Sequence, residues 1–192
     1  MSKPIIVCLV GPSCAGKTTV AKKMLELRIC KHYLRSVTDR SKRPNEDDFE
    51  YTFLDAFNAD ECVEHTEYSG HHYGILRSEV EKALEQGVAV SVVTYDGYES
   101  IATYCKDKAI VIPIGIDAPD LDIRIRLGGR TPEEREARLK RVDDDRIASA
   151  GCVLHFVNAT TNSVYRISVS ISNLINIITK GYKNGDDEND IT

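Results

Sequence analysis

Residues with the chemistry to hold a phosphate stand close to the N-terminus, in the segment GPSCAGKTT. The segment matches G-x-x-x-x-G-K-[ST] from Gly11 to Thr18 at every fixed position. Its glycines allow successive backbone N–H groups to surround a phosphate, and the helix expected from Lys17 adds the positive end of its dipole. Lys17 would reach the β- and γ-phosphates, and the Thr18 hydroxyl would ligate Mg²⁺. A glycine-rich turn without a ligand is the alternative, but the apolar run before the loop favours a nucleoside triphosphate site.

A second group of phosphate-binding residue types lies in the polar segment between Ser36 and Tyr51. Arg40 and Arg43 can converge on one dianion, and the hydroxyl of Tyr51 can complete the cradle. Taken alone, the segment is better explained as a solvated basic loop, since such charged runs are common. A phosphate loop in the same chain favours an acceptor site, and the absence of N-K-x-D and D-x-x-G motifs favours a phosphotransferase over a GTPase switch.

Apolar runs that alternate with helical patterns must position these segments. Strands are expected at residues 5–10, 33–37, 51–54, 88–95, 109–116 and 153–157. Helices are expected at residues 17–27, 57–63, 77–86, 98–105, 119–127, 133–148 and 164–178, with a turn at 96–97. This alternation predicts an α/β domain with a mainly parallel sheet. From residue 181 the chain is acidic and poor in apolar residues, so disorder is expected there.

The composition of the 192 residues, 42% hydrophobic and 29% charged, fits one globular domain. A net charge of -5 argues against a general nucleic-acid binder. The six cysteines have no C-x-x-C or zinc-finger spacing, which is typical of reduced thiols. No apolar run reaches the length of a membrane span and no signal-peptide pattern is present, so the expected location is the cytoplasm. The protein is expected to be a monomer or a homodimer.

Four stretches together resemble the guanylate kinase family: GPSCAGKTT, SVTDRSKRPNEDDFEYTF, VEHTEYSGHHYG and RLGGR, in the family's order and at nearly its spacing. With the weaker RLKRVDDD and FVNA, the resemblance covers about residues 4–178. It implies a P-loop kinase fold with a mainly parallel five-stranded sheet flanked by helices, in one domain over residues 1–180. The parts would be a core (4–35, 85–127 and 150–180), an acceptor-binding lobe (36–84), a mobile lid (128–149) and a disordered tail (181–192).

The resemblance also implies transfer of the ATP γ-phosphate to GMP or dGMP, with Mg²⁺ as cofactor held by Thr18. The residues that would bind ATP are Gly11, Ser13, Cys14, Ala15, Gly16, Lys17, Thr18, Thr19, Arg126, Arg130 and Asn158. The residues that would bind the acceptor nucleotide are Ser36, Arg40, Arg43, Tyr51, Glu64, Tyr73, Ile75 and Asp96. The residues with an implied catalytic role are Lys17, Arg40, Arg130 and Arg138. Glu64 would accept hydrogen bonds from the N1–H and the amino group of guanine. For the lid arginines, ordinary salt bridges on an exposed helix are the alternative.

Three departures from the family pattern concern the base and the lid. After Tyr-Gly the family has Ser or Thr, whereas this chain has Ile75, which cannot bond the O6 edge of guanine. In place of the family's Asp-x-Asp stand Val93 and Tyr95, with Asp96 one position later. The lid is about three residues shorter than is usual for the family. We therefore expect intact transfer chemistry and an open choice of base.

Two other functions stay open at this point. An enzyme of the same fold could act on another acceptor, such as a modified or other deoxynucleoside monophosphate, or a ribose bisphosphate that has no base to read. A guanylate-kinase-like interaction module that no longer catalyses would characteristically lack the phosphate loop, whereas Gly16, Lys17 and Thr18 are all present here. The phosphate loop therefore favours an enzyme that uses ATP and a small-molecule acceptor.

Overall fold

A parallel sheet of five strands forms the centre of the molecule. The computed structural model describes residues 3–43, 46–68, 70–128, 131–160 and 162–186. The strand order is β2-β7-β1-β8-β9, and every neighbouring pair is parallel. The strands are β1 (Ile5–Val10), β2 (His32–Tyr33), β7 (Val88–Val92), β8 (Ile110–Asp117) and β9 (Leu154–Val157). All six residues of β1 are buried, because a central strand has both faces covered. The expected α/β fold with a mainly parallel sheet is confirmed.

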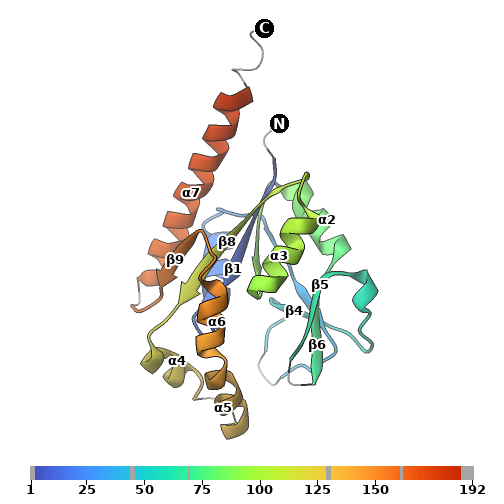
Figure 1. The fold of residues 1–192 in the computed structure, drawn as a ribbon, viewed down its shortest axis with the longest axis vertical. Helices are drawn as coiled ribbons and strands as arrows, with labels where there is room; N and C mark the ends of the chain where they lie inside the picture. The colour runs from blue at the N-terminus through green and yellow to red at the C-terminus, as the bar shows by residue number, and fades with distance from the viewer. Residues whose placement is uncertain (1–2, 44–45, 69, 129–130, 161, 187–192) are drawn as a thin grey trace.

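Helices flank the sheet (Figure 1), and the buried side chains form two hydrophobic clusters, one on each face. Side chains of β1 alternate between them: Ile5, Val7 and Leu9 enter the first cluster, and the intervening residues enter the second. The first cluster is completed by α1 (Lys17–Glu26) and α7 (Ser163–Asp186). The second is completed by α2 (Arg77–Gln86) and α3 (Tyr95–Tyr104). This packing fixes the carboxyl end of β1, where the phosphate loop begins.

A second sheet of four strands lies beside the first, in the order β4-β3-β6-β5. Its strands are β3 (Ser36–Thr38), β4 (Tyr51–Phe53), β5 (Cys62–Tyr68) and β6 (His71–Leu76). The strand expected at 33–37 is thus two strands in different sheets, since Leu34 between them is fully buried in the second cluster. The prediction of a helix at 57–63 is wrong. The 3₁₀ turn η1 (Ala59–Glu61) forms there instead, and Cys62 already pairs with β6.

Three short helices connect β8 to β9: α4 (Asp120–Arg126), α5 (Pro132–Lys140) and α6 (Val142–Ser149). The single helix expected at 133–148 is therefore two helices, which separate at Arg141 because Val142 turns into the first cluster. The turn expected at 96–97 is the first turn of α3, where the Thr94 side chain accepts from the backbone N–H of Gly97.

The closing helix α7 is longer than its apolar pattern indicates. It continues to Asp186, so the disorder expected from residue 181 is wrong for residues 181–186. Once a helix is nucleated, each further residue adds a backbone hydrogen bond at small cost, even where packing has ended. Residues 187–192 lie outside the described part of the chain. Within the described ranges, none of the helices combines the length and the apolar character needed to cross a membrane.

Candidate functional site

The phosphate loop has backbone geometry that only glycine accommodates at two positions. Gly11 has a φ of +132°, and an added Cβ would lie 2.2 Å from the carbonyl oxygen of Ile116. Gly16 has a φ of +97°, and its Cβ would lie 2.3 Å from the amide nitrogen of Asn158. That amide in turn donates to the carbonyl of Ala15 at 3.0 Å, which ties the loop to the end of β9. The loop is therefore held in a fixed shape at the start of α1.

Lys17 lies across this loop. Its ammonium donates to the carbonyl oxygens of Gly11 at 2.6 Å and Pro12 at 2.7 Å. Burial lowers the pKa of Lys17, while the negative charges of Asp145 and Glu50 act in the opposite direction. The cation thus lies inside the loop that would surround the phosphates, as its position in the motif predicts.

Arginines from α4 and α5 reach the same loop. Arg126 donates to the carbonyls of Cys14 at 3.1 Å and Asn158 at 3.2 Å. Arg138 donates to the hydroxyl of Ser13. Arg126 therefore links two other expected ATP-binding residues, Cys14 and Asn158, and the expected catalytic residue Arg138 meets a third, Ser13. Thr19 lies on α1 with an exposed side chain. Arg130 lies outside the described residues.

Asp145 on α6 is a loop contact that the motifs do not reveal. Burial raises the pKa of Asp145, while the nearby charge of Lys17 and the backbone N–H of Ser13 act in the opposite direction. The stretch RLKRVDDD contains three adjacent aspartates, and the sequence does not say which one faces the loop. In the structure Asp143 lies beside Arg146, whereas Asp145 lies near Lys17 of the loop.

The acceptor cradle is built on β3, β4 and β6. Ser36 and Tyr51 are opposite each other on β3 and β4, and the rings of Tyr51 and Tyr73 lie 5.8 Å apart. The guanidinium of Arg40 is 5.3 Å from the centre of the Tyr51 ring. Glu46 accepts from both terminal nitrogens of Arg40, at 2.8 and 2.7 Å, and these hydrogen bonds hold the pKa of Glu46 below its ordinary value. The residues predicted for the acceptor cradle therefore lie close together, with Glu46 as a partner that the sequence reasoning missed.

One donor of the cradle is left over. Arg40 is only 6% exposed, yet its Nε is one of three buried side-chain atoms without a hydrogen-bond partner in the described part of the chain. A buried N–H without an acceptor is costly, so such a group is expected to meet a ligand or water. A phosphate oxygen is an acceptor of the right kind.

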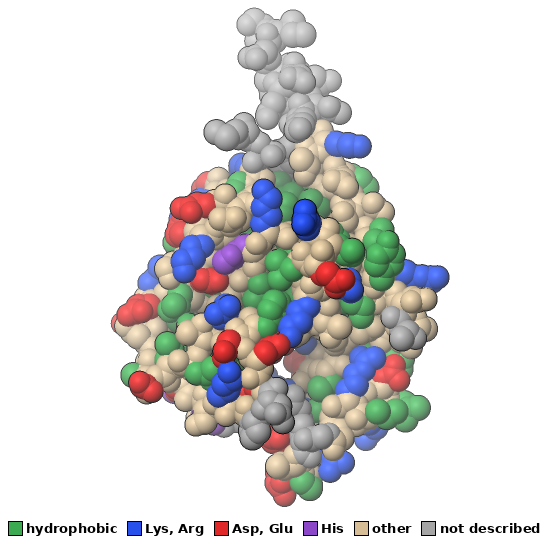
Figure 2. Space-filling model, turned by 180° about the vertical axis from the view of Figure 1, so that it is seen from behind, with side chains coloured by type: hydrophobic (Ala, Val, Ile, Leu, Met, Phe, Trp, Pro, Cys, Tyr) green, Lys and Arg blue, Asp and Glu red, His purple; other side chains and the backbone are tan. Residues whose placement is uncertain are grey.

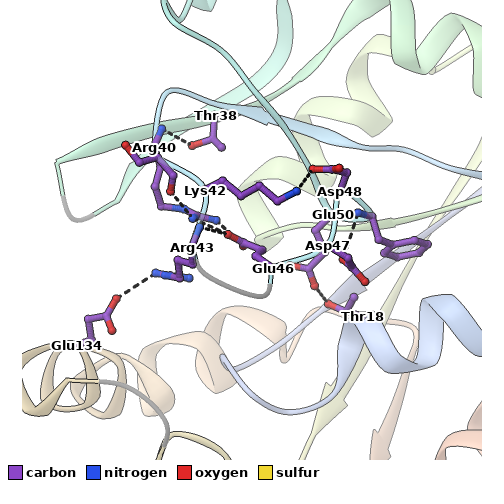
Figure 3. A network of polar contacts seen from close by, with 12 residues as sticks. Thr18, Thr38, Arg40, Lys42, Arg43, Glu46, Asp47, Asp48, Glu50 and Glu134 are labelled. Atoms are coloured by element: carbon purple, nitrogen blue, oxygen red, sulfur yellow. Dashed lines mark hydrogen bonds and ion pairs between the residues drawn. The ribbon is translucent and has the colours of Figure 1, made fainter.

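A cavity of about 400 Å³ lies between the cradle and α5. Its lining residues are Arg40, Ser41, Arg43, His71, Tyr73, Glu134, Ala137 and Arg138. Arg43 bridges toward α5, where it donates to the Glu134 carboxylate at 3.1 Å (Figure 3). The cavity thus has the acceptor arginines on one side and Arg138, which contacts the phosphate loop, on the other.

Thr18, the expected Mg²⁺ ligand, faces a carboxylate. Its hydroxyl donates to Glu50, which precedes Tyr51 in the acceptor lobe (Figure 3). Hard Mg²⁺ prefers oxygen ligands, so a hydroxyl and a carboxylate fit this ion. Over the described ranges, no group of three or more His, Cys, Asp and Glu side chains forms a ready-made metal cluster. An ion held here would therefore take most of its ligands from a nucleotide and water.

The residues expected to read the base are brought together less closely than the residues expected to bind phosphate. Glu64 on β5 lies opposite Ile75 on β6, and burial raises the pKa of Glu64 to about 7. A Cβ on Gly97 would lie 3.1 Å from a Glu64 carboxylate oxygen, so α3 approaches Glu64 closely. Ile75 is fully buried in the second cluster. Asp96 is exposed in the first turn of α3.

A phosphate loop after the first strand of a parallel sheet, facing a second phosphate cradle, defines a P-loop nucleotide-binding fold of the kinase type. The chain belongs to the guanylate kinase family: the family model described as "Guanylate kinase" matches residues 1–160. The resemblance seen in the sequence and the P-loop kinase fold are both confirmed.

Individual relatives agree with the family model. The chain is 34% identical to the guanylate kinase of Salinibacter ruber over 165 residues, which cover 80% of this chain and 87% of that protein. It is 35% identical to the guanylate kinase of Porphyromonas gingivalis over 158 residues, which cover 74% of this chain and 80% of that protein. The crystal structure of guanylate kinase from Anaplasma phagocytophilum has a TM-score of 0.64 and 23% identity, covering 93% of this chain and 88% of that one. The structural likeness shows a shared fold.

Proposed function

We propose that this protein transfers the γ-phosphate of ATP to GMP or dGMP, with Mg²⁺ as the cofactor, and forms ADP and the nucleoside diphosphate. The observation that carries the proposal is the unpartnered Nε of Arg40 in the cradle beside the 400 Å³ cavity. Phosphoryl transfer depends on in-line positioning and on neutralisation of charge. The cavity has cations on the acceptor side and on the phosphate-loop side, as this reaction requires.

Each residue of the site has a physical role in this proposal. Lys17 and Arg138 neutralise the negative charge of the transferred group, and Mg²⁺ bound at Thr18 supplies further neutralisation. The acceptor phosphate is held by Ser36, Arg40, Arg43, Tyr51 and Tyr73. Arg126 and Asn158 hold the phosphate loop and the ATP beside it.

We also propose the division into a core, an acceptor-binding lobe at 36–84 and a lid. Closure of the lid over the cavity would exclude water and so prevent hydrolysis of ATP. Arg146 on α6 donates to Asp117 at 2.9 Å and Asp120 at 2.7 Å, which fastens α6 to the end of β8 and the start of α4. The moving part would therefore be α5, rather than the whole of 128–149.

Glu64 supports guanine as the base of the acceptor. Among the described residues its carboxylate has no hydrogen-bond or ion-pair partner, and two N–H donors of guanine would provide partners. Because the pKa of Glu64 is about 7, the carboxylate becomes protonated below neutral pH and loses acceptor capacity. We expect binding of GMP to weaken as the pH falls below 7.

Ile75 supports a second candidate, a kinase of the same fold for a different base. The side chain opposite Glu64 is apolar and fully buried, so no hydroxyl is available there for the O6 edge of guanine. A base with a methyl group or another apolar edge would need no hydroxyl at this position. A ribose bisphosphate is less well supported, because such an acceptor offers no N–H donors to Glu64.

The partners proposed are small molecules, and the compartment proposed is the cytoplasm. On the face that Figure 2 shows, Lys and Arg side chains are interspersed with Asp and Glu rather than gathered as a nucleic-acid-binding surface would be. All six cysteines are unpaired, as in a reducing compartment.

A coupled assay of ADP release tests the proposal. Mg-ATP is offered with GMP, dGMP, dAMP, dCMP, dTMP and hydroxymethylated pyrimidine monophosphates, each at several concentrations. Turnover with GMP or dGMP and little with the others is the expected result. Turnover only with another base would assign the second candidate, and ATP binding without turnover of any of these acceptors would overturn both.

A further inference from the structure

The strand that neighbours the phosphate-loop strand lacks an acidic residue at its carboxyl end. In P-loop nucleotide-binding proteins, Mg²⁺ is held by the Ser or Thr of the loop together with an Asp of the Walker-B strand. Here β7 pairs directly with β1 and is followed by Val93, Thr94 and Tyr95. Asp96 comes next but is exposed on α3. The usual carboxylate is therefore missing from this position.

A carboxylate reaches the loop from the other side. Glu50 accepts from the hydroxyl of Thr18. Its backbone carbonyl accepts from the N–H of Ser36 at 3.0 Å, so the residue is fastened to the edge of the second sheet. The contact joins α1 of the core to the acceptor lobe, as Figure 3 shows.

The neighbouring acids of the same loop behave differently. Asp47 pairs with Lys22 and Asp48 with Lys42, each at 2.5 Å and on the exposed surface. Over the described ranges Glu50 forms no ion pair with a Lys, Arg or His. A carboxylate without a pairing side-chain cation, placed against a hydroxyl that the motif assigns to Mg²⁺, has the chemistry of a metal-binding group.

We propose that Glu50 holds the Mg²⁺ of the bound Mg-nucleotide together with Thr18, in place of the carboxylate missing after β7. The proposal rests on the proposed function, since it assumes that Mg-ATP occupies the phosphate loop. The proposal also links binding of the metal to the position of the acceptor lobe. Glu50 is adjacent to Tyr51 of the acceptor cradle, so the same short segment contacts the metal and the acceptor phosphate. Metal binding on the donor side then helps to place the acceptor lobe.

The test measures binding of a fluorescent ADP analogue to the whole protein, without any acceptor. Affinity is recorded in EDTA and in a Mg²⁺ titration, for wild type, Glu50→Gln, Glu50→Asp and the matched control Asp48→Asn. Loss of a group that holds or orients a metal typically weakens metal binding about 10–100-fold. We expect Glu50→Gln to need at least ~10-fold more Mg²⁺ for half-saturation, with its affinity in EDTA unchanged. Asp48→Asn should match wild type, and Glu50→Asp should fall between.

Two results would overturn the proposal. An unchanged Mg²⁺ midpoint in Glu50→Gln would show that the carboxylate takes no part in metal binding. An equal loss of affinity in EDTA and in Mg²⁺ would show that Glu50 only shapes the loop. Neither result depends on turnover, so failure here is distinguishable from failure of the proposed function, which appears as absence of product with every acceptor.

Discussion

The phosphate-handling region and the base-reading region of this molecule differ in how completely they are built. Lys17, Arg126 and Arg138 all contact the phosphate loop, and Arg40 and Arg43 line one cavity with Arg138. At the base-reading end, Glu64 stands without a hydrogen-bonding partner in the described chain. Ile75 is turned into the core and Asp96 is exposed. In the proposed reaction, charge neutralisation and choice of base would therefore depend on separate groups, and one could change while the other stays.

The largest effect is expected from the phosphate loop itself. Lys17→Met removes the cation that the loop holds over two backbone carbonyls, and loss of one such charge-stabilising donor typically lowers kcat by about 10²–10³-fold. Lys22→Met is the matched control, because Lys22 pairs with Asp47 on the exposed surface. The measurement is kcat in the ADP-release assay. Similar kcat values in the two variants would show that the phosphate loop takes no part in the reaction.

The base-reading end should reveal itself in the pH dependence of stability. The pKa of Glu64 is about 7 in the folded protein, above the ordinary value of 4.5, because burial disfavours the charge. For a raised acid pKa, the associated stability is present below pH 4.5 and is lost as the pH rises through 7. Glu64→Gln removes this loss. The free energy of unfolding of the variant, relative to that of wild type, should therefore rise by about 2–3 kcal/mol between pH 5 and pH 8.

Urea unfolding of the protein without nucleotide at the two pH values checks this prediction. Glu85→Gln on α2 is a suitable control, since its side chain is exposed and its replacement should leave the pH dependence of unfolding unchanged. A constant difference between Glu64→Gln and wild type from pH 5 to pH 8 would mean that Glu64 is solvated. Burial of Glu64 could then not be the reason for a preference for N–H donors.

Ile75→Thr sharpens the same comparison from the opposite strand. The hydroxyl replaces apolar volume in a fully buried position, so we expect a loss of about 1–3 kcal/mol in the free energy of unfolding. If the new hydroxyl reaches a guanine edge, the KM for GMP should fall although the protein is less stable. Ile75→Val is the control, because it removes a methyl group without adding a polar one. Equal KM values in the two variants would show that position 75 belongs to the core alone.

Much of the fold follows from local patterns. The run at 5–10 is apolar at every position, which only a doubly covered strand satisfies, and helix α2 begins and ends where its pattern and Gly87 indicate. The division at Leu34 could not be predicted, because both flanking segments look like one strand until their partners in two sheets are known. The break at Arg141 has no Gly or Pro to mark it and depends on packing of Val142.

The site shows the same division between motif and context. The cations and the glycines were predictable, because phosphate chemistry demands their types and spacing. The acidic partners of these cations could not be predicted. Glu46, Glu50 and Asp145 each stand among other acids in the sequence, and only the packed structure selects which one turns toward the site. Tertiary position, rather than residue type, distinguishes Glu50 from Asp48.

The smallest expected effect concerns the contact between the two sides of the cavity. Arg43 and Glu134 are 3.1 Å apart but each more than a third exposed, so a double-mutant cycle with Arg43→Gln and Glu134→Gln should give a coupling below ~1 kcal/mol in urea unfolding. The same cycle with Glu133→Gln, an exposed neighbour, should give none. A lid that opens in each turnover needs such a weak contact, since the substrates must supply the rest of the closing free energy. A coupling above ~2 kcal/mol would mean that α5 and the acceptor lobe form one rigid unit, and the proposed lid would then have to lie elsewhere.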